Sequence, residues 1–117
     1  MKKKSNETEF FVGSGNLYKD LGYPNPEEMQ VKAALAQQIY ETIKSRNLTQ
    51  TKAAELMGID QPKVSNIIRG RISKYSIDRL IRFLRALERD VEIRVKKHEK
   101  RSTNPTLSVT GVTKSRL

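Results

Sequence analysis

The sequence predicts an all-α fold, a bundle of four to five helices that is followed by one C-terminal β-strand. Apolar residues recur at helical spacing in several segments between residues 26 and 87, and a residue that favours helix starts precedes each segment. Two of these segments are short and are separated by a glycine-containing turn. Beyond residue 90 the apolar period changes from that of a helix to that of a strand.

Composition restricts the classes of function. The 117 residues carry a formal net charge of +10, which suits one small domain that binds an anionic partner. The chain has no cysteine and one histidine, His98, so thiolate and paired-histidine metal sites are excluded and neither a metal nor a cofactor is expected. No apolar run approaches the roughly 20 residues that cross a bilayer, and none follows the lysines at 2–4. We therefore expect a cytoplasmic protein with no membrane contact.

Three regions are expected along the chain. Residues 1–9 are polar and are predicted to be a disordered basic N-terminus. Residues 10–97 are predicted to form the folded domain, and their first part, residues 10–24, is expected to be an irregular arm packed on it. Residues 98–117 are rich in Ser, Thr, Lys and Arg and lack periodicity, so a flexible basic tail is predicted.

Four helices have recognisable starts within the folded domain. Asn25, Thr49, Asp60 and Ser76 are residue types that favour the position before a helix. Gly58 and Gly70 can adopt the positive φ that ends a helix. The helices are expected to span residues 26–46, 50–57, 61–69 and 77–87.

A single strand is expected after the last helix, because polar and apolar residues alternate strictly from residue 90 to residue 96. One strand leaves its backbone groups unpaired, and the sequence offers no second convincing strand. We therefore expect it to pair, antiparallel, with the same strand of a second subunit in a homodimer. The apolar residues of this dimer strand are Val91, Ile93 and Val95. Alternatively, these side chains cover the core of their own subunit.

The two short helices that flank Gly58 form a helix-turn-helix arrangement. The major groove of DNA admits an α-helix and presents a distinct pattern for each base pair, so the second helix is expected to enter it. At ~100° per residue, Val64, Ile67 and Ile68 share one apolar arc of this helix, and its polar residues face away from it. The residues expected to read base edges are Gln61, Pro62, Lys63, Ser65, Asn66 and Arg69.

Polar residues that precede and follow this helix in the sequence are expected to contact the DNA backbone. Free N–H groups at the start of the preceding helix attract phosphate, and a basic loop follows the reading helix. The residues expected to contact phosphate are Thr49, Gln50, Thr51, Arg71, Ser73, Lys74 and Tyr75.

The segment from Leu48 to Gly70, LTQTKAAELMGIDQPKVSNIIRG, resembles the helix-turn-helix of the phage-repressor (Cro/C1, XRE-type) family. The wider stretch from Leu17 to Val95 is similar to the HigA-like antitoxin branch in its GNLYKDLG, QPKVS, IRGR and DVEI segments. The resemblance implies a lambda-repressor-like bundle and a dimeric repressor that binds double-stranded operator DNA in its own operon. It also implies a partner toxin of the RelE/HigB type, which cuts mRNA. The residues that match the family's DNA-facing positions are Gln50, Gln61, Lys63, Ser65 and Asn66.

Other functions remain as alternatives. A stand-alone phage-type regulator would have the same DNA-binding features without a toxin partner, and a protein whose main task is to block a toxin is compatible with repression. An ordinary helical hairpin explains the caps but not the polar outward face of the second helix. A protein that binds single-stranded RNA usually needs aromatic side chains on which the bases stack. The chain has seven aromatic residues in all, which argues against this class of function. No carboxylate pair or activated nucleophile stands out, so no catalytic residue is expected and the protein is predicted not to be an enzyme.

Overall fold

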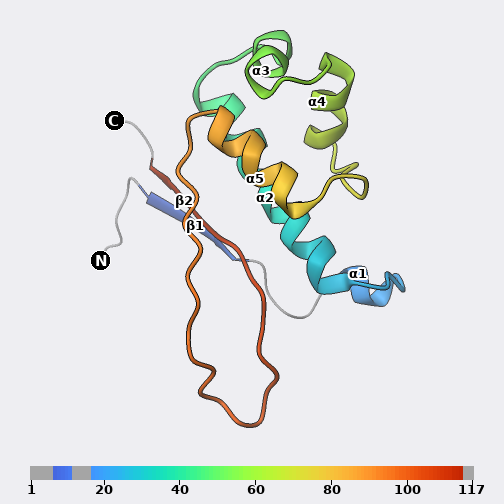
Figure 1. Cartoon of the computed structure of the whole chain (residues 1–117), viewed down its shortest axis with the longest axis vertical. Coiled ribbons are helices and arrows are strands. Elements are labelled where there is room, and N and C mark those ends of the chain that lie inside the picture. The colour runs from blue at the N-terminus through green and yellow to red at the C-terminus, as the bar shows by residue number, and fades with distance from the viewer. Residues whose placement is uncertain (1–6, 12–16, 115–117) are drawn as a thin grey trace.

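A computed structural model shows, in the part of the chain that it describes, five helices that form the body of the molecule and two strands that lie beside it (Figure 1). The structure describes residues 7–11 and 17–114. The predicted helical bundle is confirmed, and one further short helix forms within the segment that was expected to be an irregular arm. The elements in chain order are β1 Glu7–Phe11, α1 Leu17–Asp20, α2 Pro26–Ser45, α3 Gln50–Met57, α4 Gln61–Ile68, α5 Ile77–Ala86 and β2 Thr110–Lys114.

The core lies where the apolar sides of α2, α3, α4 and α5 meet. Each buried aliphatic side chain contributes about 1.5–3 kcal/mol to folding, which is how short helices with little stability of their own are held in place. The loop between α4 and α5 also contributes one fully buried side chain. The large apolar side chains that are almost completely removed from solvent are Ile39, Val64, Ile67, Ile72, Leu80 and Leu87.

The helix ends follow from particular residues. The hydroxyls of Thr49 and Ser76 each accept a hydrogen bond, at 3.0 Å, from the backbone N–H three residues further on, and so cap α3 and α5. Gly58 closes α3 with φ at 72°, in the left-handed region that favours glycine. Asp60 precedes α4 without a side-chain cap bond, and Pro62 occupies the first turn of that helix.

The segment predicted as a dimer strand has no regular secondary structure in the single chain. Residues 90–96 follow α5 and belong to neither strand of the sheet. Val91 is half-buried against the core, whereas Ile93 and Val95 are 77% and 91% exposed. The alternative expectation, that these side chains cover their own core, therefore holds for Val91 and is wrong for the other two.

A two-stranded sheet forms instead from the two ends of the described chain. β1 and β2 pair antiparallel, with Glu7 opposite Lys114 and Phe11 opposite Thr110. Residues 7–9 were expected to be disordered and residues 110–114 to lie in a flexible tail. The structure corrects both expectations, because each segment supplies the backbone hydrogen-bonding partner that the other needs. The rest of the predicted disordered N-terminus, residues 1–6, lies outside the described residues.

The segment that leads into β2 lies against α2. The backbone N–H of Leu107 donates to a carboxylate oxygen of Glu27 at 2.6 Å. Gly111 is buried, and a β-carbon at this position would collide with the side chain of Gln38. None of the helices in the described part of the chain combines the length and the apolar character needed to cross a membrane.

Candidate nucleic-acid interface

The two helices of the predicted helix-turn-helix, α3 and α4, lie together at the end of the bundle that is farthest from the tip of the loop between α5 and β2 (Figure 1). Val64 and Ile67 hold α4 against the bundle, since neither side chain has any exposed surface. Ile68 is half-buried against the same core. The predicted apolar arc of this helix is therefore confirmed, and its polar residues are left on the outer side.

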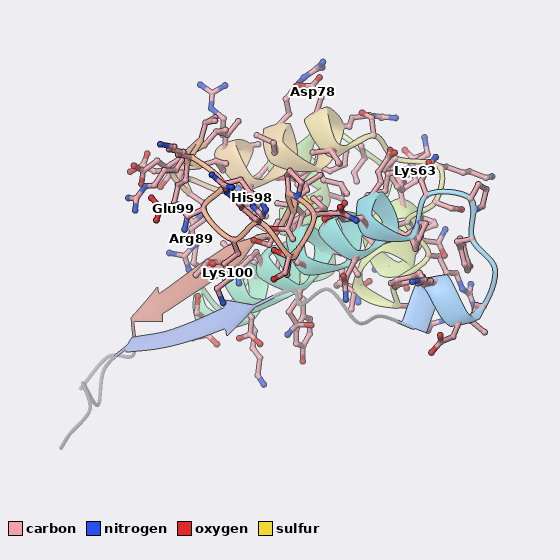
Figure 2. The ribbon with its side chains drawn as sticks, turned by 90° about the horizontal axis from the view of Figure 1, so that it is seen from below. Lys63, Asp78, Arg89, His98, Glu99 and Lys100 are labelled. Atoms are coloured by element: carbon pink, nitrogen blue, oxygen red, sulfur yellow. The ribbon has the colours of Figure 1, made fainter. Side chains whose placement is uncertain are left out.

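The residues predicted to read bases are distributed along this outer side of α4. Those at its first turn, Gln61 to Lys63, are exposed, and so is Arg69 just beyond its last turn. Ser65 and Asn66, in the middle of the helix, are partly exposed. Lys63 lies well apart from the loop that carries His98, Glu99 and Lys100 (Figure 2).

Two hydrogen bonds orient amide side chains of this set. The hydroxyl of Thr51, on α3, donates to the amide oxygen of Gln61 at 3.2 Å. The guanidinium of Arg71, beyond α4, donates to the amide oxygen of Asn66 at 3.4 Å. In both bonds, a residue predicted to contact phosphate therefore lies beside a residue predicted to read bases. Each bond also restricts the rotamers of the amide side chain that accepts it.

Most residues predicted to contact phosphate are accessible. Thr49 and Thr51 are exposed at the start of α3, where the N-terminal N–H groups attract anions, and Gln50 is partly exposed. Beyond α4, the exposed residues of the basic loop are Arg71, Ser73 and Lys74.

Tyr75 departs from the expectation of a phosphate contact. It is 8% exposed, and its ring packs edge-on against Phe83 with 5.8 Å between the ring centroids. The guanidinium of Arg79 lies over both rings, at 5.4 Å and 5.6 Å from their centroids. Burial against the core and a cation–π contact together account for this placement, and Tyr75 is a structural residue of the basic loop.

One polar residue near this loop was missed at the level of sequence. Lys32 of α2 is buried, and its ammonium nitrogen lies 3.3 Å from the backbone oxygen of Ser73. Its spacing from Leu35, Ala36 and Ile39 places Lys32 on the apolar side of α2. This helical spacing is the sequence signal from which its burial could have been predicted.

Among the residues that the structure describes, no three His, Asp or Glu side chains gather closely enough to hold a metal ion. The accessible residues of α3, α4 and the basic loop offer hydrogen-bond donors, amides and cations, and two hydrogen bonds join residues of α3 and of the loop to α4.

Comparisons with known proteins agree with this geometry. A family model described as "Helix-turn-helix domain" matches residues 17–96. Among solved structures, a chain titled "Putative XRE Family Transcriptional Regulator" is similar, with 37% sequence identity and a TM-score of 0.69. The similarity covers 74% of this chain and 97% of that chain. A comparison with curated proteins finds no match.

Proposed function

This chain belongs to the helix-turn-helix domain family and is a DNA-binding regulator of the XRE type, and from that premise we propose that it represses transcription as a homodimer bound to a twofold operator in double-stranded DNA. The family is non-enzymatic, in agreement with the expectation from sequence. DNA as the partner favours a cytoplasmic location.

The observation that carries the proposal is the division of α4 into two sides. Its apolar side is fixed in the core by Val64 and Ile67, so the helix is presented as a rigid element. Its accessible side carries the residues that are predicted to read base edges. Amides can pair with adenine in a bidentate manner, and the cations Lys63 and Arg69 can pair with the acceptors of guanine.

Selection of sequences from random duplex DNA, followed by gel-shift titration at several salt concentrations, tests the proposal. We expect a selected site with two half-sites about one helical turn, roughly 34 Å, apart. The logarithm of the affinity should fall linearly with the logarithm of the salt concentration, because the DNA releases counterions when its phosphates are bound by the protein. Binding that is indifferent to sequence contradicts a repressor.

Lys74→Ala is expected to weaken binding to the selected operator and to random DNA alike, because an exposed cation of the basic loop contacts phosphate rather than bases. The slope of log affinity against log salt should decrease by about 1. Fluorescence anisotropy titrations measure both quantities. Lys100→Ala is the matched control, since Lys100 lies in the distant loop and should change neither value (Figure 2). A loss confined to the operator would assign Lys74 to base reading.

The proposed dimer is supported by the exposed apolar residues after α5. Antiparallel pairing of residues 90–96 with the same segment of a second copy would satisfy their backbone groups and cover Ile93 and Val95, which are largely uncovered in one chain. The alternation of residue types, with charged residues between these apolar ones, suits a strand that is covered on one side only.

Ile93→Lys is expected to raise the dissociation constant of the dimer at least tenfold, because burying an unpaired lysine costs more than about 1.4 kcal/mol. Analytical ultracentrifugation over a concentration series gives the constant. Glu92→Gln, on the alternate side of the proposed strand, should leave it within about twofold. A wild-type protein that stays monomeric, or equal behaviour of the two variants, would refute this mode of pairing.

We also propose that the protein is the antitoxin of a type II pair that neutralises an mRNA-cleaving toxin of the RelE/HigB type. The support is the resemblance of the segment from Leu17 to Val95 to the HigA-like branch. Co-expression with the product of the adjacent gene is the test, and we expect a stable complex and restored growth. A gene without such a neighbour would favour a stand-alone phage-type regulator.

A further inference from the structure

A buried lysine lies under the basic loop. Lys32 is 8% exposed although it carries a charged group, and lysine is rarely buried unless it is paired. Its ammonium nitrogen lies 3.3 Å from the backbone oxygen of Ser73 and 3.8 Å from a carboxylate oxygen of Glu28, one turn earlier on α2. An ammonium donor makes a stronger hydrogen bond to a carbonyl than a neutral donor does. The contact therefore ties the loop to the longest helix of the bundle.

Two apolar side chains and one hydrogen bond from α2 hold the middle of the basic loop on the bundle. The side chain of Ile72 is 1% exposed, and the ring of Tyr75 packs on Phe83. Between these two side chains, the Ser73 oxygen is bound by Lys32. A backbone hydrogen bond from the N–H of Tyr75 to the oxygen of Ile72, at 3.0 Å, closes the turn. The segment between the two apolar anchors is thus held by one side chain from outside the loop.

The accessible residues of the loop lie next to these anchors in the sequence. Arg71 precedes Ile72, and Ser73 and Lys74 stand between Ile72 and Tyr75, with all three exposed. Their directions depend on the backbone that the anchors hold. Arg71 also donates to Asn66 in the middle of α4, so the position of the loop affects a base-reading residue as well.

We propose that Lys32 is a positioning residue for DNA binding: its ammonium holds the Ser73 carbonyl, and thereby the backbone from which Arg71 and Lys74 reach phosphate. This inference rests on the proposed function of the loop. Lys32 itself is covered by the fold, so it acts through the loop and not by touching DNA. A loop that is already ordered loses less conformational entropy on binding than a free one.

The test compares three variants of the full chain in anisotropy titrations with the selected operator and with random duplex DNA. Lys32→Met, which keeps the aliphatic stem but removes the donor, is expected to weaken both affinities about tenfold. Lys32→Arg, which keeps a donor, should stay within about threefold of the wild type. Lys44→Met removes a cation from an exposed position on the same helix and should have no effect. Equal binding by Lys32→Met and the wild type overturns the proposal.

A second comparison separates positioning from the loss of one positive charge. In an Arg71→Ala/Lys74→Ala background, Lys32→Met should change affinity less than twofold, because the contacts that it supports are already absent. An undiminished tenfold effect in that background would show that Lys32 acts by its charge, and would overturn the proposal.

Hydrogen exchange without DNA tests the inference independently of the proposed function. Lys32→Met should raise the exchange rates of the backbone amides at residues 71–75 several-fold and leave those of α3 unchanged. Unchanged loop exchange would contradict the inference even if the protein binds its operator. Increased loop exchange in a protein that binds no DNA would instead refute the proposed function alone. If Lys32→Met fails to fold, exchange and binding of Lys32→Leu, which also lacks a donor, compared with Lys32→Arg, provide the same test.

Discussion

Ile67→Ala is expected to lower the free energy of unfolding by about 2–5 kcal/mol, the range for removing a large aliphatic side chain from a packed core. Ile67 has no exposed surface and joins α4, the helix that is predicted to read bases, to the bundle. The truncation loses buried apolar contacts and leaves a cavity that neighbouring helices fill only in part. For a domain of this size the melting temperature should fall by roughly 10 °C or more. Urea unfolding and thermal unfolding, both monitored by circular dichroism, give the free energy of unfolding and the melting temperature.

Leu56→Ala is the matched control for this experiment. Leu56 lies on α3 and is 37% exposed, so its truncation removes fewer buried contacts. We expect a change of about 1 kcal/mol or less. Equal destabilisation by the two variants would mean that α4 is not held in place by its apolar side. The proposal that α4 is presented to DNA as a rigid element would then lose its support.

Asn66→Ala is expected to weaken binding to the cognate operator by about 1–3 kcal/mol, or roughly 5- to 150-fold, and binding to random DNA far less. Asn66 lies in the middle of α4, is partly exposed, and its amide is oriented by Arg71. An amide that reads a base edge contributes only when the matching base is present. Competition titrations of operator against random duplex give the ratio of affinities directly.

Gln37→Ala provides the matched control, because it removes an amide of the same chemical type from an exposed position on α2. Its specificity ratio should equal that of the wild type. If Asn66→Ala also preserves the ratio, the reading surface lies elsewhere on α4. In that case Lys63 and Arg69, at the two ends of the helix, become the next residues to test.

Much of the fold and of the candidate site follows from local sequence patterns. The apolar spacing and the caps at Thr49 and Ser76 predicted the bounds of α3 and α5 to within about one residue. The same periodicity predicted which side of α4 is buried, because helix geometry alone decides which residues share a face. Gly58 was predicted to end α3 since a positive φ is strained for other residues.

The sequence by itself therefore determined the four helices α2 to α5, the turn between α3 and α4, and the polar side that α4 leaves accessible, since all of these depend on neighbours within a few residues. Only the tertiary structure decided that β1 pairs with β2, that Tyr75 is buried, and that Lys32 binds the Ser73 carbonyl. The β1–β2 pair and the Lys32–Ser73 bond join segments far apart in the chain, and Tyr75 belongs to the core that forms only when the helices pack. Local periodicity carries no information on which distant groups meet, because packing of the whole bundle selects the partner.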